Sequence, residues 1–370
     1  MGPAQIKVTN EVNHDSRLIS ILRFPLTAGV VVVHGGITDA FTKAAAMNGE
    51  AIHLPVTQFV ENLLSHGICC ICVPLFYIFS GYLFFHKGEW GWQTYLGKLR
   101  KRIRSLFVPY VLYSFSAILI IGLLQLLLPQ LQSGAHTPIK DWQFWDYLHN
   151  GLWRYGHEWA PFVGPLWYLR NLMIIVILSP LVYWFIIITR YYGIIALGLF
   201  YILGNPSVPG VLDAFFFSWG AYYSIFKKSF TSEIGRFQHI SWLALPLFFI
   251  DAATKDAGWN RYVHNVAVLL GIILLVSLVT ALLSKRDIKS NQLLLSSTFF
   301  VFAIHEPYLD QVTKVLARMI HLPQSQILAD FSALVIYLLY DITVILVLVT
   351  LFGCIRRISP KLASVLSGGR

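Results

Sequence analysis

Arg23 and His34 lie inside the first long apolar stretch of the chain, where ionisable side chains are costly. A charged group near the centre of a bilayer costs about 2.5–3.5 kcal/mol or more, so such residues are functional candidates by default. Eleven residues separate the two, and eleven helical steps of about 100° return to within about 20° of the starting direction while rising about 16 Å. The spacing predicts that both side chains lie on one face of a helix, Arg23 in the inner half of the membrane and His34 beyond the midplane.

A second histidine, His305, is followed by Glu306 in a late apolar segment. Counting about 1.5 Å per residue from the predicted inner helix ends, near Leu18 and Asn291, places His34 about 24 Å and His305 about 21 Å deep. We therefore predict that the two imidazoles face one chamber. Imidazole accepts a proton from a hydroxyl near neutral pH, so the chemistry indicated is proton transfer.

The partners of these groups can be predicted from the same depth counts. Arg170 reaches a similar level from the opposite side, so we expect it to pair with Glu306, because an isolated carboxylate there is very costly. Asp341 reaches the level of Arg23, which leaves a structural pair between these two open. Pro25 lacks the N–H of a helical residue and predicts a kink near Arg23.

A purely structural interpretation of the first helix also stays open. Arg23 could extend its guanidinium to the inner interface, and His34 could simply cap the helix before Gly35-Gly36. In neither role would the side chain take part in a reaction.

The composition places the chain in a bilayer. It has 370 residues, 56% of them hydrophobic and 12% charged, and a mean hydropathy of +0.63, which leaves too little polar surface for a soluble globule. The formal charge of +10 is scattered between apolar segments and no nucleic-acid-binding motif accompanies it. We therefore expect the bilayer, and no nucleic acid, as a partner.

The apolar runs predict an all-α, polytopic protein of about ten transmembrane helices. Helices five to seven are shorter than the roughly 20 residues that cross a bilayer. If the N-terminus is cytosolic, about 20 of the 28 Lys and Arg residues fall on the cytosolic side, which favours both termini inside. We expect one membrane domain, 1–370, without a removable signal peptide or separate soluble domain. The predicted helices are 18–38, 68–86, 106–128, 164–189, 192–204, 211–226, 238–251, 262–283, 292–319 and 330–353.

Five short motifs carry a resemblance to a known family. Arg23 with His34 comes first, and four stretches follow in order: Val73-Pro74-Leu75-Phe76 with Phe79-Ser80-Gly81-Tyr82; Lys101, Arg104 and Pro109; Leu166-Trp167-Tyr168-Leu169; and Phe302-Ala303-Ile304-His305. In this order they resemble the integral-membrane acyltransferase family 3. The resemblance implies O-acylation of a glycan or similar acceptor, with acyl-CoA as donor and no permanently bound cofactor.

The resemblance also implies a donor site. Arg23, Ser80, Gly81, Lys101, Arg102 and Arg104 are its predicted residues. The basic run 98–104, expected as a cytosolic loop, could hold the coenzyme phosphates, or could only set the orientation of the chain. Lys101 departs from the family pattern, which has two arginines three residues apart, and lysine cannot form a bidentate fork. Ser80-Gly81 could make room for the pantetheine arm or simply permit helix packing.

The predicted acceptor residues are Trp153, Trp159, Trp167 and Arg170. Sugars stack on aromatic rings, and the outer segment 129–163 is rich in them, although an interfacial aromatic belt has the same composition. Cys69, Cys70 and Cys72 cluster in an apolar segment without a second ligand pair, so packing is favoured over metal or redox chemistry. No metal is predicted.

Together these features predict a multi-pass O-acyltransferase of a bacterial inner membrane that moves an acyl group, expected to be acetyl, from cytosolic acetyl-CoA to a hydroxyl of an envelope glycan or glycolipid. His34 is the predicted general base or transient acyl carrier, and His305 and Glu306 are the other catalytic candidates. A transporter or lipid flippase is the alternative, since it would also need ionisable groups at membrane depth. A non-catalytic scaffold with the same fold is a third possibility.

Overall fold

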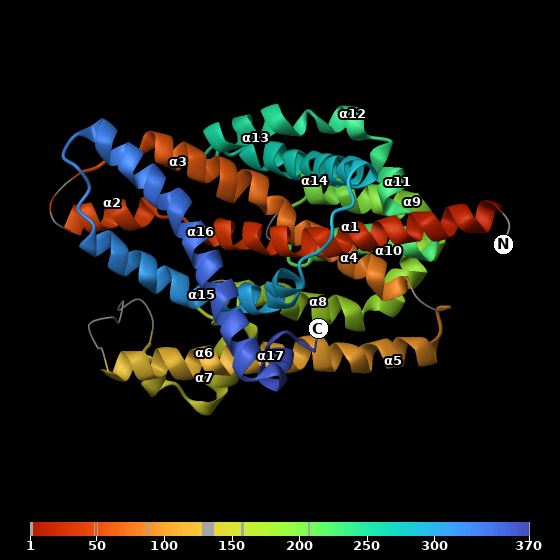
Figure 1. Ribbon diagram of the computed structural model, residues 1–370, viewed down its shortest axis with the longest axis horizontal. Helices are drawn as coiled ribbons and strands as arrows, with labels where there is room; N and C mark the ends of the chain where they lie inside the picture. Colours follow the sequence, from red (N-terminus) through yellow and green to blue (C-terminus); the bar gives the residue numbers. More distant parts are fainter. Residues whose placement is uncertain are drawn as a thin grey trace.

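The computed structural model describes residues 3–47, 49, 51–86, 89–127, 137–156, 159–205 and 208–369. Within these ranges the chain is helical and contains no β-strand, which confirms the all-α prediction. Most of the longer helices, such as α1 (Pro3–His34), α6 (Val108–Leu127) and α14 (Asn260–Lys285), run roughly along the long axis of the molecule, whereas α16 (Gln326–Ile358) crosses it obliquely (Figure 1).

The helices of the first half of the chain include two that are interrupted by π or 3-10 turns. They are α1 (Pro3–His34), α2 (Thr38–Met47), α3 (Pro55–Glu61), η1 (Asn62–Gly67), η2 (Ile68–Ile71), α4 (Cys72–Phe85), α5 (Trp92–Arg102), η3 (Ile103–Phe107), α6 (Val108–Leu127), η5 (Ile139–Asp141), α7 (Phe144–Leu148), η6 (His149–Trp153), η7 (Gly164–Leu166) and α8 (Trp167–Ile177). Those of the second half are α9 (Ser179–Leu203), α10 (Val211–Ile225), α11 (Phe230–Gly235), α12 (Gln238–Ser241), α13 (Ala244–Ala253), α14 (Asn260–Lys285), α15 (Gln292–Met319), α16 (Gln326–Ile358) and α17 (Pro360–Leu366).

Six helical segments of the described chain are long and apolar enough to cross a membrane: His14–Met47, Pro55–Phe85, Trp92–Leu127, Ser179–Leu203, Asn260–Lys285 and Gln326–Ile358. Several of them turn large apolar side chains outward, such as Leu127 on α6 and Ile188 on α9, each 75% exposed. Such surfaces suit lipid rather than water. The chain is therefore a multi-pass membrane protein, whereas the count of ten spans and the cytosolic position of both termini stay predictions.

The predicted boundary between the fourth and fifth helices coincides with a break in α9 at Arg190, whose φ of 53° and ψ of −135° are not helical. The expected helix 164–189 is itself divided, because α8 ends at Ile177 and α9 begins at Ser179. Pro180 stands in the first turn of α9, a position where its missing N–H costs nothing. The short helix predicted at 192–204 is the part of α9 that follows the break at Arg190, and the whole of α9 is long and apolar enough to cross a membrane.

Two segments expected as loops are helical: the connection 39–67 between the first two predicted helices, and the basic run 98–104. The segment 39–67 contains α2 and α3, and α3 continues through the π turn η1 and the 3-10 turn η2 into α4. The basic run 98–104 lies on α5 and η3, which lead without a loop into α6. Its basic side chains therefore point in different directions around a helix instead of gathering in one loop.

Helix α1 runs through the middle of the molecule (Figure 1) and contacts α4, α14, α15 and α16. It remains helical through Pro25, so the proline does not break the helix, and a bend near Arg23 stays a prediction. By contrast, α15 breaks at Glu306, whose φ of −124° and ψ of 145° are those of a strand. Glu306 precedes Pro307, and a residue before proline is pushed out of the helical region.

Glycines bring α4 and α10 into close contact. A Cβ atom at Gly81 would collide with the carbonyl oxygen of Phe217, and one at Gly220 would collide with that of Ile78. Because these neighbours are backbone atoms, a side chain cannot be accommodated by a rotamer change. Gly81 is thus a packing residue, and its predicted part in donor binding has no support from its position.

We expect Gly81→Ala to destabilise the protein by about 1–3 kcal/mol, the usual cost of overpacking. Thermal unfolding in detergent, followed by tryptophan fluorescence, measures this. Gly97→Ala on α5 is the matched control, because nothing lies within 4 Å of the added Cβ and alanine favours a helix by about 1 kcal/mol. Equal melting temperatures for the two variants would contradict the packing role.

Candidate active site

The structure brings together His34 of α1 with His305 and Glu306 of α15. The ring centroids of His34 and His305 are 5.2 Å apart, and Nδ1 of His34 lies 3.7 Å from Oε2 of Glu306. The side chain of His34 is 30% exposed, whereas His305 is only 2% exposed. The two imidazoles thus share one site, as their depths predict, and one of them is accessible.

The break in α15 positions Glu306. Its carboxylate faces His34 on one side and Gly164 on the other, where an added Cβ would lie 2.5 Å from Oε2. Gly164 opens the turn η7 that leads into α8. The ion-pair partner of Glu306 is therefore His34, and the predicted pair with Arg170 is wrong.

The backbone sets the tautomer of His305. Its Nδ1 lies 3.2 Å from the carbonyl oxygen of Val301, and because a carbonyl only accepts, Nδ1 carries the hydrogen. In the neutral ring Nε2 is then the basic atom. Within the described part of the chain Nε2 has no hydrogen-bond partner, so it is free to accept a proton.

A cavity of about 730 Å³, its open mouth included, lies against the other half of α1. It is called the Arg23 cavity here: Arg23, Ser80 and Arg102 are polar residues of its wall, and most of the remainder is apolar. Neither arginine forms an ion pair with a described residue. Two unpaired guanidinium groups facing one space favour an anionic ligand.

Only part of the predicted donor site lines this cavity. Lys101 and Arg104 are exposed to the surface, on either side of the half-buried Arg102. Lys101, the residue that departs from the family pattern, therefore does not line the cavity. Helical geometry explains why Arg102 lines the cavity while its neighbour Lys101 faces the surface, because consecutive side chains point about 100° apart.

His34 and Glu306 line a much larger cleft of about 2610 Å³, open to solvent, which is called the His34 cleft here. The four predicted acceptor residues also line it: Trp153, Trp159, Trp167 and Arg170. Trp153 and Trp159 are 49% and 58% exposed. The arrangement suits a sizeable ligand with apolar faces and many hydroxyl groups. His157 and Glu158, in the same aromatic segment, lie outside the described residues.

Arg170 holds the wall of the cleft. It is 8% exposed, and its guanidinium donates to the carbonyl oxygens of Trp153 and of Trp159, the latter at 2.9 Å. Its Nε donates to Asn171, which in turn donates to Asp213 of α10 at 2.7 Å. Arg170 thus fastens the aromatic segment to α8 and α10, and this anchoring occupies the donors that were predicted to meet Glu306.

Asp341 lies at the wrong level to pair with Arg23. A Cβ added to Gly35 would collide with its carboxylate, so Asp341 packs against the residue after His34. Helix α16 begins at Gln326, before the predicted start at 330, and crosses the molecule obliquely (Figure 1). The longer, inclined helix places Asp341 at the far end of α1, which excludes it as a partner for Arg23.

The sequence of this chain matches a known protein family. The profile of a family described as "Acyltransferase domain" matches residues 19–355. The chain belongs to this acyltransferase family. It is also 23% identical, over 379 residues, to the succinoglycan biosynthesis protein ExoH of Rhizobium meliloti (strain 1021), and the match covers 96% of this chain and 92% of that protein. No solved structure gives a significant match.

Family membership confirms the resemblance carried by the five motifs and makes this protein an acyltransferase. The matched range contains every predicted site residue, but the roles of individual residues stay predictions. Arg261 and Asn265, at the start of α14, also line the cleft and were not among the predicted site residues. They donate to the carbonyl oxygens of Gly204 and Tyr201, and no local motif announces them.

The anchoring role of Arg170 predicts a specific defect. Arg170→Gln should free the segment that carries Trp153 and Trp159, so that the acceptor KM of this acyltransferase rises about tenfold, the effect of losing one or two charged hydrogen bonds, while donor binding is unchanged. Acceptor titrations of acyl transfer measure this. Lys140→Gln, an exposed cation of the same outer segment, is the control. A variant with unaltered acceptor KM would exclude the role.

Proposed function

We propose that this protein is a membrane O-acyltransferase that transfers an acyl group, acetyl in the first instance, from cytosolic acyl-CoA to a hydroxyl of an envelope glycan or glycolipid. Family membership supports acyl transfer and disfavours the transporter. The relative from Rhizobium meliloti is named for succinoglycan biosynthesis, which supports a glycan acceptor here.

The observation that carries the proposal is the position of His305 between the two compartments. Its ring centroid is 6.2 Å from that of Phe302, which lines the Arg23 cavity, and 5.2 Å from that of His34, which lines the His34 cleft. Two ligands entering from opposite sides would meet at these histidines. A two-substrate transfer across a membrane requires such an arrangement.

The Arg23 cavity suits the donor. Its mostly apolar wall fits a pantetheine arm, and Arg23 and Arg102 offer charge-assisted hydrogen bonds to phosphate. Ser80 provides a hydroxyl there, 3.3 Å from that of Tyr168. The His34 cleft, with three tryptophans in its wall, suits the acceptor.

In the proposed reaction, His34 takes the proton of the acceptor hydroxyl as its oxygen attacks the thioester carbonyl carbon. The C–S bond then breaks, and the proton passes to the leaving thiolate, so that the products are an ester and free coenzyme A. Glu306 stabilises the cationic ring of His34, and Nε2 of His305 can relay the proton. General-base catalysis of this kind contributes about 10²–10⁴-fold to the rate.

Replacing His34 tests the chemical step. His34→Gln should reduce acyl transfer about 10²–10⁴-fold and leave acyl-CoA affinity nearly unchanged, because the base touches the reacting atoms but not the coenzyme phosphates. Release of free thiol and mass analysis of the glycan measure transfer, and a fluorescent acyl-CoA measures binding.

His14→Gln is the matched control, since His14 is exposed on the same helix. If His34→Gln transferred acyl groups as fast as this control, the general-base assignment would be wrong. If it lost acyl-CoA binding in parallel with transfer, His34 would belong to the donor site instead.

The basic run offers an internal comparison for the donor site. Arg102→Gln should weaken acyl-CoA binding about tenfold or more, since a charged hydrogen bond contributes about 1.5–3 kcal/mol. Arg100→Gln, exposed on the same helix α5, should have little effect. Equal losses in the two variants would indicate a general attraction by positive charge instead of a site at Arg102.

A further inference from the structure

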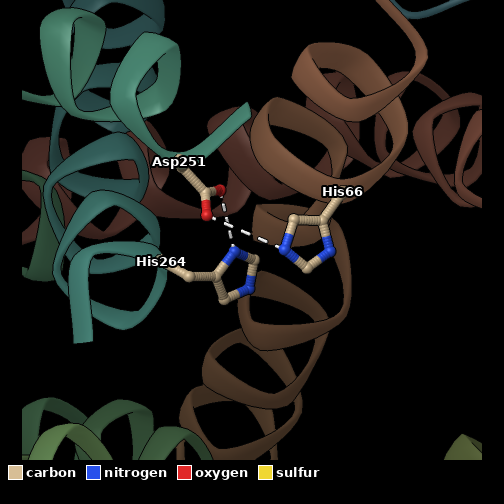
Figure 2. Close-up of side chains that lie close together, drawn as sticks. All are labelled: His66, Asp251 and His264. Atoms are coloured by element: carbon tan, nitrogen blue, oxygen red, sulfur yellow. Dashed lines mark hydrogen bonds and ion pairs between the residues drawn. The ribbon is translucent and has the colours of Figure 1, made fainter. Parts of the chain in front are cut away.

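His66, Asp251 and His264 form a group apart from the active site, where η1 meets the consecutive helices α13 and α14 (Figure 2). His66 lies in the π turn η1, Asp251 near the end of α13 and His264 in the second turn of α14. Nδ1 of His264 is 2.9 Å from Oδ2 of Asp251, and Nε2 of His66 is 3.7 Å from Oδ1. The two imidazole rings stack on each other, with centroids 4.6 Å apart, and both face the carboxylate.

In the described part of the chain, two polar atoms of this group are buried without a hydrogen-bond partner. Asp251 is fully buried, and among the described residues neither its Oδ1 nor Nε2 of His66 has a hydrogen-bond partner. Leaving a buried polar atom unbonded is costly, the more so for a charged one, and native proteins rarely do so without a reason. A cation bound between these two atoms would satisfy both.

The donor set and its dimensions fit a zinc-type ion. Two imidazole nitrogens and one carboxylate oxygen are the ligands of open zinc sites, with bonds of about 2.0–2.1 Å. A tetrahedron with such bonds has edges of about 3.3 Å, and each imidazole lies near that distance from one oxygen of the carboxylate, His264 at 2.9 Å from Oδ2 and His66 at 3.7 Å from Oδ1. One ligand atom from each residue already lies within 4.8 Å of the others, so rotation of the imidazoles can complete the site.

Neighbouring residues hold the three segments in place. Asn260 donates to the carbonyl oxygen of Asp251 at 2.9 Å, and Lys255 donates to Asn62 of η1 at 2.9 Å. Cys69 and Cys72 instead pack against Gly29 of α1, in keeping with the packing role that their apolar surroundings predict. A π turn such as η1 is itself frequent at functional sites.

We propose that His66, Asp251 and His264 bind one divalent ion of the zinc type, with a fourth position left for water. The ion fixes the start of α14 against η1 and α13. On the neighbouring turns of α14, Arg261 and Asn265 line the His34 cleft, so the ion stabilises one wall of that cleft. This site depends on the ligand geometry and not on the reaction assigned to the protein.

Metal binding by the purified full-length chain tests this proposal directly. After chelation and dialysis against Zn²⁺ in detergent, the wild type should retain about one ion per chain, and Co²⁺ should give the intense visible absorption of a tetrahedral site. His66→Gln and Asp251→Asn should each lower retention at least tenfold and abolish the rise in melting temperature caused by Zn²⁺. His239→Gln, an exposed histidine of α12, is the control and should bind like the wild type.

Two results would overturn the site: a wild type that retains no Zn²⁺, or retention that both substitutions leave unchanged. If the variants fail to fold, the test uses the wild type alone and asks whether Zn²⁺ protects its histidines from chemical modification. Zn²⁺ should then shield His66 and His264, but not His239, from diethylpyrocarbonate, as mapped by mass spectrometry. Equal modification of all three with and without Zn²⁺ would exclude the ion.

Discussion

The arrangement of the whole site depends on one constraint: Arg23 and His34 are carried by the same uninterrupted helix. Because α1 stays helical through Pro25, the distance between them is fixed at about 16 Å along the axis. The helices packed around α1 must therefore supply one compartment at each level. They do so with different chemistry, two arginines in a mostly apolar cavity at one level and a histidine, a glutamate and tryptophans in an open cleft at the other.

Two prolines in helices have opposite effects, and the difference sets the position of Glu306, one of the proposed catalytic residues. Pro25 leaves α1 helical, whereas the backbone of α15 leaves the helix at Glu306, the residue before Pro307. The break in α15 turns the carboxylate of Glu306 toward His34, where an unbroken helix would have pointed it about 100° away from His305.

Sequence periodicity and depth counting predict the depth of a side chain along its own helix and the face of the helix that it shares with others. The common face of Arg23 and His34 and the shared level of His34 and His305 need only the rise and twist of a helix. Contacts between helices did not follow from these rules, because neither the rotation nor the tilt of a helix can be read from its own sequence. Arg170 was therefore given the wrong partner. The same limit hid the group at His66, whose members come from three segments with no spacing between them to recognise.

The two compartments differ in size in a way that matches the two substrates of an acyl transfer. A flexible thioester arm binds best where apolar walls confine it and charges hold only its phosphate end, whereas a glycan needs width and stacking surfaces. Between them, the rings of Tyr168 and Phe302 are 5.9 Å apart, edge to face, and His305 lies beyond Phe302. Tyr168 and Phe302 form part of the wall of the Arg23 cavity. In the proposed reaction they would shield a bound thioester from water, so that transfer rather than hydrolysis would depend on this aromatic pair as well as on the histidines.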